Sequence, residues 1–449
     1  MAGRPSKSHA LDVWMNGERV GTWSLSPRDG HAFAYAEAWL ANPRRRPISL
    51  SLPLTRETDP FRGELVEAYF DNLLPDSRDI RTRIARRYGV SPTHAFQLLE
   101  AIGRDCVGAV QLLPTSSPTP EVRRIEARPL TTAQIVVLLD QTLSAAPLAP
   151  GEQDKLRISL AGAQEKTALL LQDNQWQLPL GTTPTTHILK LPLGRVGAVQ
   201  ADFSTSVENE WLCSRVLHAF DLPVAHCWME SFGPHKVLVV ERFDRHRFPD
   251  WWARLPQEDF CQVLGIPPQH KYESHGGPGI DAILDKLRGS QEAEADRQRF
   301  LMTQLIFWLL GAPDGHAKNF SVFLEPEGRF RLTPLYDVMS AWPVTGSGQN
   351  LFNRKKLKLA MALWGKNKHD LIDGIQRRHW NETAKRNAMG PSFETSIEKV
   401  LAAVPAVLEK VASELPPGFP AKVSVPILQG IQAQATRLAA VPAQADAQR

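Results

Sequence analysis

Apolar and polar positions alternate in the first part of the chain. In LDVWMNGERVGTWSL, residues 11–25, the alternation runs on both sides of Asn16-Gly17, a dipeptide typical of tight β-hairpins. Asp76 or Ser77 is a natural N-cap for a helix that begins just after it. The pattern also predicts a strand at 48–54 and helices at 64–74 and 76–90. Together these elements predict an N-terminal α+β subdomain over residues 1–113.

The pattern changes after a segment rich in Pro and Ser, residues 114–129, which is typical of a linker. Residues 130–255 alternate mainly with the period of strands. The elements expected there are a helix at 131–146, strands at 157–162, 166–172, 176–180 and 186–193, a helix at 207–220 and a strand at 236–244. Strands that precede helices, without a regular alternation of the two, indicate an α+β fold.

Helical periodicity dominates residues 256–436. The longest apolar run, 300–312, is too short for a bilayer and is interrupted by polar residues, so it predicts a buried helix. Residues 437–449 are low in complexity and are expected to be disordered.

Composition narrows the class of protein. Hydrophobic residues make up 43% and charged residues 22% of the 449, as in an ordinary globular protein, and the formal net charge is only +4. The four cysteines lie far apart with no C-x-x-C spacing, which argues against a zinc site and against a disulfide framework. The first residues contain no apolar run of a secretion signal. We therefore expect a soluble cytoplasmic protein without a membrane partner.

One segment carries candidate chemistry. GAPDGHAKNFSVF places Asp314 five residues before Asn319, and LTPLYD adds Asp337 eighteen residues later. Phosphoryl transfer needs these parts: one acid orients the attacking hydroxyl, while an amide and a second acid hold Mg²⁺ against the nucleotide phosphates. A turn with a helix cap could produce the same letters, so the motif requires support from the rest of the chain.

That support lies upstream, in the order of a kinase domain. Lys190 sits inside an apolar strand, where a lysine either reaches solvent at the strand edge or meets an anion. Gly162, in RISLAGAQEKT, is suited to a loop that covers phosphates, although the loop has no Walker pattern. Either Glu208 or Glu210 could support the lysine, and the sequence does not choose between them. The segment 241–243 in KVLVVERFD could pair with adenine or be an edge strand.

Longer strings identify a resemblance. SLAGAQEKTALL, PTTHILKLP, VERFDR, KYESHGGPGI, GAPDGHAKNFSVF and RLTPLYDVMSA, with FDNLLPDS and IGRDCVGAVQLLP before them, resemble the HipA toxins, the serine/threonine protein kinases of bacterial type II toxin–antitoxin modules. The resemblance covers roughly residues 11 to 430. It implies a two-lobed protein-kinase-like fold, with a strand-rich N-terminal lobe and an all-helical C-terminal lobe. The D-x-H-x-x-N-type loop is similar to that of the lipid-kinase branch.

The resemblance also implies roles for individual residues. Asp314 would be the catalytic base, Asn319 and Asp337 would bind Mg²⁺, and Ser159 would be the autophosphorylated serine whose modification switches the kinase off. The residues that would contact ATP are Ala161, Gly162, Ala163, Gln164, Glu165, Lys166, Lys190, Glu241, Arg242, Phe243, His316, Ala317, Lys318 and Asn319.

The family resemblance further implies partners. The substrate would be an aminoacyl-tRNA synthetase such as the glutamyl enzyme, so that activity halts translation and promotes persistence. A HipB-like helix-turn-helix antitoxin dimer would hold the kinase at operator DNA, and Arg377 and Arg378 in IQRRHW are weak candidates for direct DNA contacts. Two alternatives remain: a DNA-bound corepressor whose kinase activity is dispensable, and a small-molecule or lipid kinase.

Overall fold

The structure is a computed structural model that describes residues 9–54, 59–144 and 159–441. The chain divides into two compact units. Unit 1 contains residues 1–191, 230–269 and 321–330, and unit 2 contains residues 192–229, 270–320 and 331–449. Each unit is described by itself.

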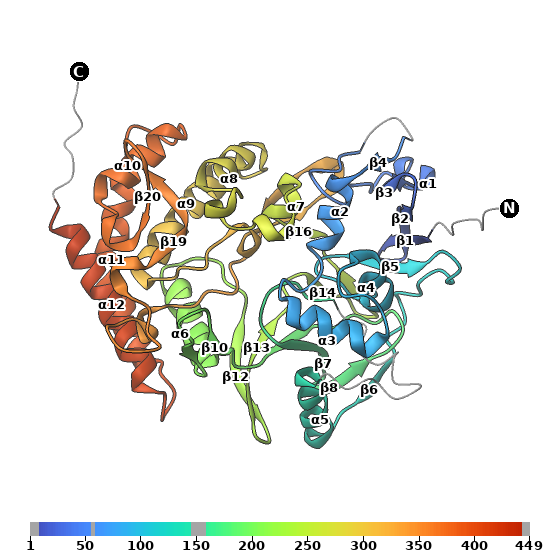
Figure 1. Cartoon of the computed structure of the whole chain (residues 1–449), viewed down its shortest axis with the longest axis horizontal. Coiled ribbons are helices and arrows are strands. Elements are labelled where there is room, and N and C mark those ends of the chain that lie inside the picture. Colours follow the sequence, from blue (N-terminus) through green and yellow to red (C-terminus); the bar gives the residue numbers. More distant parts are fainter. Residues whose placement is uncertain (1–8, 55–58, 145–158, 442–449) are drawn as a thin grey trace. The chain divides into compact units, whose positions relative to one another are not determined.

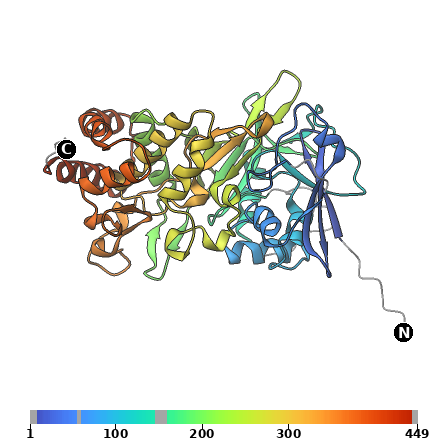
Figure 2. The ribbon, with the colours of Figure 1, turned by 90° about the horizontal axis from the view of Figure 1, so that it is seen from above.

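A five-stranded antiparallel sheet opens unit 1, in the order β4-β3-β2-β1-β5 (Figure 1; blue in Figure 2). The predicted hairpin is confirmed: β1 pairs with β2, and Asn16 and Gly17 between them have φ of 49° and 83°. Both angles are required by the type I′ turn that matches the twist of paired strands. The strands are β1 (His9–Met15), β2 (Glu18–Ser26), β3 (Gly30–Tyr35), β4 (Phe61–Arg62) and β5 (Val110–Pro114).

Helices cover one face of this sheet and bury its aromatic side chains. Trp23 stacks on Phe70 of α2 at a centroid distance of 4.0 Å and lies 4.6 Å from Phe96 of α4. Ser77 caps α3 by accepting from the Ile80 N–H, so the predicted cap is confirmed. The helices are α1 (Glu37–Leu40), α2 (Glu64–Asp71), α3 (Arg78–Tyr88) and α4 (Ala95–Ile102).

The strand predicted at 48–54 is wrong. This segment forms only an isolated bridge between Ser49 and Leu52. The Tyr35 hydroxyl accepts from the Ile48 N–H at 2.9 Å and donates to the Leu52 carbonyl at 2.5 Å. A buried side chain therefore satisfies the backbone groups that a neighbouring strand would otherwise pair with.

A six-stranded sheet follows, in the order β12-β13-β9-β7-β8-β6. Strand β7 has the predicted bounds, and β8, β9 and β13 lie within two or three residues of theirs. No strand forms at 159–162, and the rest of the strand predicted at 157–162 lies outside the described residues. The elements are β6 (Ala127–Pro129), α5 (Thr132–Leu143), β7 (Lys166–Gln172), β8 (Gln175–Pro179), β9 (His187–Lys190), β12 (Cys227–Phe232) and β13 (His235–Glu241).

Short strands complete unit 1. β14 pairs with β15, and β16, β17 and β18 form a three-stranded sheet. Their bounds are β14 (Arg245–Arg247), β15 (Trp252–Arg254), β16 (Gln257–Asp259), β17 (Ser321–Leu324) and β18 (Phe330–Leu332), and α7 (Phe260–Leu264) follows β16.

Unit 2 is mostly helical. Helix α9 is buried along most of its length, and α12 packs against both α9 and α11 (Figure 1, Figure 2). The predicted helices at 207–220 and 300–312 are confirmed as α6 and α9, and two strand pairs that the periodicity did not indicate are added. The elements are β10 (Gly194–Val196), β11 (Ala201–Phe203), α6 (Ser206–Ala219), α8 (Ile280–Lys286), α9 (Ala293–Leu310), β19 (Lys358–Trp364), β20 (Lys368–Leu371), α10 (Arg377–Arg386), α11 (Glu394–Ser413) and α12 (Ala421–Ala439).

The predictions for the C-terminal tail and for the apolar run at 300–312 can be compared with the structure. Helix α12 continues to Ala439, inside the tail expected to be disordered at 437–449, and residues 442–449 lie outside the described part of the chain. Among the described residues, no helix combines the length and the apolar character that a bilayer crossing requires.

Candidate active site

The candidate catalytic loop of unit 2 begins where α9 ends. Gly311 closes the helix at φ 56°, and a Cβ there would lie 2.4 Å from the Trp342 ring, so only glycine fits this turn. Asp314 follows three residues later with its side chain 53% exposed. Its carbonyl accepts from the His316 N–H at 2.9 Å, which tightens the loop. The loop thus presents one acid to solvent from a rigid, buried helix.

Asn319 connects the two acids of the motif. Its side-chain Nδ2 donates to the Asp314 carbonyl and to the Asp337 carbonyl, each at 3.1 Å. Asp337 has a φ of 60°, an unusual angle for a residue other than glycine and one that is enriched at functional sites. Both hydrogen bonds use the amide nitrogen, so the amide oxygen is the atom suited to a metal. Asp314, Asn319 and Asp337 therefore lie close together in the folded chain, although eighteen residues separate Asn319 from Asp337.

The residues between the base and the amide are buried. His316, Ala317 and Lys318 are each less than 7% exposed, and Ala317 begins a short 3-10 turn, η4 (Ala317–Asn319). The Lys318 carbonyl accepts from the Tyr336 hydroxyl at 2.9 Å. This contact ties the catalytic loop to the segment that carries Asp337.

In unit 1, two lysines of the predicted ATP site lie on neighbouring strands. Lys166 of β7 is the direct register partner of Lys190 of β9. Side chains at directly opposed positions of antiparallel strands share one face of the sheet with Cβ atoms about 4.5–5.5 Å apart, and like charges there repel. Lys190 is nearly buried, at 5% exposed. This face of the sheet therefore favours an anion.

The predicted phosphate loop, residues 161–166, is held by backbone contacts. Gly162 has a φ of 107°, and a Cβ there would lie 2.6 Å from the Lys166 ammonium nitrogen. The Gly162 carbonyl accepts from the Asp76 N–H at 2.9 Å, and the Glu165 carbonyl accepts from the Leu191 N–H at 3.0 Å. A glycine is favoured here because a residue with a side chain rarely adopts this positive φ.

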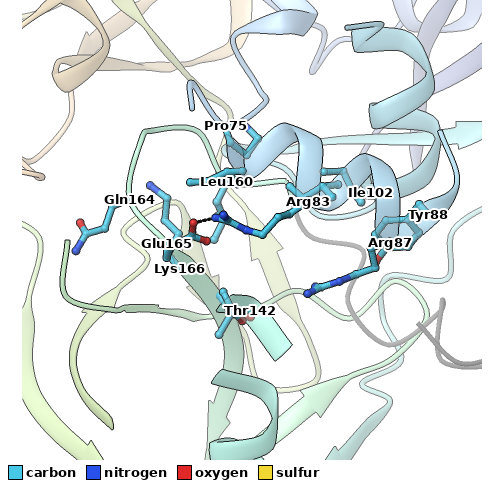
Figure 3. Close-up of a pocket in the computed structure, with 13 residues that line it drawn as sticks. Pro75, Arg83, Arg87, Tyr88, Ile102, Thr142, Leu160, Gln164, Glu165 and Lys166 are labelled. Carbon is cyan, nitrogen blue, oxygen red and sulfur yellow. Dashed lines mark ion pairs between the residues drawn. The ribbon is translucent and has the colours of Figure 1, made fainter. Parts of the chain in front are cut away.

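A small cavity of about 80 Å³ adjoins this loop, between α3 and β7 (Figure 3). Arg83 of α3 points toward the loop and forms an ion pair with Glu165 (Figure 3). Gln164 donates to the Leu191 carbonyl at 2.6 Å. Two of the predicted ATP contacts, Gln164 and Glu165, thus have protein partners that hold the loop in this conformation.

Ser159 precedes the loop and is fully buried. Its hydroxyl donates to the Leu73 carbonyl at 2.7 Å, and its N–H donates to the Asp105 carbonyl at 3.1 Å. In this conformation the hydroxyl is therefore enclosed by protein and must be released before it can accept a phosphate.

The predicted adenine segment, Glu241–Phe243, ends β13. The Arg242 N–H already donates to the Thr186 carbonyl at 2.9 Å. The Arg242 guanidinium is buried and donates to Asp244 at 2.7 Å. The N–H, the carbonyl and the guanidinium of Arg242 are thus all engaged inside unit 1, and the adenine role of the segment stays a prediction.

Sequence reasoning missed the carboxylate that organises this region. Asp105 is buried, and its side chain accepts from Arg242, Arg245 and Arg254 at distances between 2.9 and 3.3 Å. Burial acts to raise the pKa of Asp105, but the three guanidinium groups more than offset this effect and hold it well below its usual range. The only signal was the position of Asp105 inside the string IGRDCVGAVQLLP, which contributes to the family resemblance.

Tyr272 was also missed. Its hydroxyl donates to Asp314 Oδ1 at 2.5 Å, although the two residues are 42 positions apart. KYESHGGPGI, which contains Tyr272, was part of the resemblance but had no assigned role.

Four further candidates can be placed. Glu208 and Glu210 are both buried in α6 of unit 2, so the choice between them as a support for Lys190 stays a prediction. Arg377 is buried and forms an ion pair with Glu394, and this pairing removes it as a candidate for a DNA phosphate. Arg378 next to it is exposed.

Comparison with known proteins finds matches over most of the chain. The model of the HipA-like C-terminal domain matches residues 158–411, and the HipA N-terminal domain matches residues 11–113. The protein Y4mE of Sinorhizobium fredii is 39% identical over 335 residues, which cover 74% of this chain and 77% of that protein. The serine/threonine-protein kinase toxin HipA of Shewanella oneidensis is 27% identical over 376 residues, which cover 80% of this chain and 79% of the toxin.

A solved structure supports the fold. The Shewanella oneidensis complex of HipA, HipB and operator DNA contains a chain that superposes with a TM-score of 0.77 at 23% identity, covering 96% of this chain and 97% of that chain. The mixed helix and strand fold expected from the sequence is thereby confirmed. With the family model over more than half of its length, the chain belongs to the HipA family of serine/threonine-protein kinases.

Proposed function

We propose that this chain is the toxin of a toxin–antitoxin module and transfers the γ-phosphate of Mg²⁺–ATP to serine or threonine hydroxyls of a protein. The observation that carries the proposal is the double hydrogen bond of Asn319 to the carbonyls of Asp314 and Asp337. An ordinary helix cap would bind its own first turn and would have no reason to reach the backbone of a residue eighteen positions away.

Asp314 is the base in this proposal. Its exposed carboxylate accepts the hydrogen bond of the attacking hydroxyl, orients it and takes its proton as the bond to phosphorus forms. Placing the nucleophile is the main task of the protein, because phosphoryl transfer involves little covalent chemistry on the enzyme.

Asn319 and Asp337 fit a magnesium ion. Mg²⁺ prefers oxygen ligands and is commonly held by one or two carboxylates together with substrate phosphates. The described residues contain no group of three or more His, Cys, Asp or Glu side chains placed to hold a metal ion, so a protein-only cage is not expected there. When bound, the ion would neutralise charge on the phosphates. Its protein ligands would be the Asn319 amide oxygen and the Asp337 carboxylate.

Lys166 and Lys190 are proposed to bind the phosphates of ATP. Their opposed positions on β7 and β9 put two ammonium groups on one face of the sheet, where an anionic phosphate would lower the repulsion between the like charges. The loop 161–166 contributes a glycine at positive φ, a conformation that allows backbone N–H groups to approach an anion. The backbone of Glu241 and Phe243 is proposed to recognise adenine.

We also propose autophosphorylation of Ser159. Its buried hydroxyl is held by the Leu73 carbonyl, so the modification requires the segment to leave this position. A phosphoserine carries nearly two negative charges and could not return to a site without solvent. Modification would thus hold the loop 161–166 away from its present conformation and inactivate the kinase.

The partners proposed follow the family. The similar solved structure is a complex in which a HipA chain is assembled with HipB and operator DNA. For this chain we propose a HipB-like antitoxin that tethers the kinase at its operator as a corepressor, with Arg378 as the remaining candidate for a direct DNA contact. The proposed substrate is an aminoacyl-tRNA synthetase, such as the glutamyl enzyme.

The test begins with the purified full chain, Mg²⁺ and ATP. Mass spectrometry should find phosphate on Ser159, and a panel of purified aminoacyl-tRNA synthetases should include one that becomes phosphorylated. Asp314→Asn should abolish both signals and retain ATP binding. A wild-type chain that binds ATP and phosphorylates neither itself nor any synthetase would refute the proposal.

A further inference from the structure

The segment around Tyr272 is a rigid loop within unit 2. A Cβ on Gly277 would come within 1.8 Å of the His270 carbonyl oxygen, and one on Gly279 within 2.4 Å of the Glu273 carboxylate. The Gly277 N–H donates to the Tyr272 carbonyl at 3.0 Å. The two glycines therefore allow the chain to fold back closely on the segment that carries Tyr272.

Glu273 anchors this loop to the hairpin of β19 and β20. Its Oε2 accepts from the Ala362 N–H of β19 at 2.7 Å, and its Oε1 accepts from the Lys368 ammonium of β20 at 2.5 Å. The Glu273 side chain is only 13% exposed, so its carboxylate is largely shielded from water, whereas the Lys368 side chain is 51% exposed. The residue next to Tyr272 is thus fixed by a structural element that contributes nothing to the catalytic loop.

Tyr272 faces the catalytic loop. Its hydroxyl donates to Asp314 Oδ1 at 2.5 Å, its ring packs edge-on against the His316 ring at 4.9 Å, and the Lys271 carbonyl accepts from the Ala317 N–H at 3.3 Å. Three contacts of different kinds therefore join the loop to the segment 314–317.

We propose that Tyr272 is a positioning residue that holds the carboxylate of Asp314 for catalysis. The inference rests on the proposed role of Asp314 as the base. A carboxylate that is half exposed can rotate, and each turn away from the acceptor hydroxyl reduces the fraction of productive complexes. A carboxylate has two oxygens with about four acceptor positions. With Oδ1 held by Tyr272, Oδ2 is presented to the hydroxyl of the substrate.

Tyr272→Phe removes the hydroxyl and keeps the ring against His316. The expected result is a fall in kcat of about 10- to 100-fold, the range that a misplaced reacting group costs, with the KM for ATP unchanged within about twofold. The measurement uses initial rates with whichever acceptor the wild-type chain phosphorylates.

The outcomes separate this inference from the proposed function. An inactive wild-type chain refutes the proposed function, and the positioning role with it. An active wild type, an inactive Asp314→Asn and a Tyr272→Phe with wild-type kcat refute the role of Tyr272 alone. A loss that appears in KM, or phosphate found on Tyr272 by mass spectrometry, would also overturn the inference.

A second variant covers the case in which Tyr272→Phe fails to fold. Glu273→Gln keeps the tyrosine and weakens the anchor of its loop to Ala362 and Lys368. It should lower kcat without raising the KM for ATP, and a folded Glu273→Gln with wild-type kcat would contradict the inference.

Discussion

The substitution Asp105→Asn should be among the most destabilising single changes in unit 1. The Asp105 carboxylate is shared by three buried guanidinium groups, which come from Arg242, Arg245 and Arg254. Thr185 adds two further donors to Oδ2, its N–H at 3.1 Å and its hydroxyl at 2.6 Å. All the neighbours of this carboxylate are therefore donors, and an amide in its place would turn one of its two acceptors into a donor.

The magnitude follows from the count of charges. Three arginines face two buried acids, Asp105 and Asp244, so the cluster has a formal charge of +1, and Asp105→Asn raises it to +2. Removing one partner of a buried ion pair costs about 3–5 kcal/mol, because the other charge stays buried without compensation. That is a large part of the total stability of a typical domain, about 5–15 kcal/mol.

Urea unfolding of the full chain, followed by hydrogen exchange of peptides from α4 and β5, measures the effect within unit 1. With a denaturant slope near 3 kcal/mol/M, the expected loss lowers the midpoint by at least about 1 M. The matched control is Glu18→Gln, the same change of acid to amide in an exposed pair with Arg44, and it should cost no more than about 1 kcal/mol. Equal midpoints for Asp105→Asn and Glu18→Gln would refute the reasoning.

Two further predictions concern pH and nucleotide. Burial, with His369 and Arg378 nearby, lowers the pKa of His379 to about 4 from an unfolded value near 6.5. Its Nδ1 accepts from the Gln376 N–H, so stability should be complete above pH 6.5 and fall by at most about 3 kcal/mol as the pH drops to 4. In the His379→Gln variant, the urea midpoint should vary less with pH over this range. A pH dependence equal to that of the wild type would contradict the assignment. Lys190→Met should weaken ATP binding at least about tenfold by calorimetry and reduce the thermal stabilisation by ATP, whereas wild-type affinity would exclude Lys190 from the phosphate site.

Local patterns predicted the elements whose hydrogen bonds are local. The turn at Asn16-Gly17 and the cap at Ser77 depend on neighbours within a few residues, and both are confirmed. The segment 48–54 has the same alternation as a strand, but its backbone is satisfied by the hydroxyl of Tyr35, which is distant in sequence. The alternation of apolar and polar residues indicates which side chains are buried, but it does not indicate which groups pair with the backbone.

The same distinction applies to the candidate site. Residues that would perform chemistry are restricted in type, since few side chains can act as a base or bind Mg²⁺, so Asp314, Asn319 and Asp337 could be recognised from their spacing. Tyr272 and Asp105 are restricted by what they contact in three dimensions. Any donor that reaches Asp314 Oδ1 could replace the tyrosine hydroxyl in principle, and the sequence does not say that position 272 reaches it.

This difference has a consequence for how the site tolerates change. Asn319 binds carbonyl oxygens, which every residue possesses, so the side chains at 314 and 337 can be exchanged without breaking the contacts that join these segments. Asp314→Asn should therefore inactivate the chain with little loss of stability. Asp105 instead binds three arginine side chains and the Thr185 hydroxyl at once, and no single replacement at 105 other than an acid satisfies them. We therefore expect that the residues proposed to perform chemistry can be substituted with little loss of stability. The residues that hold the strands carrying the phosphate and adenine segments should instead be required for unit 1 to stay folded.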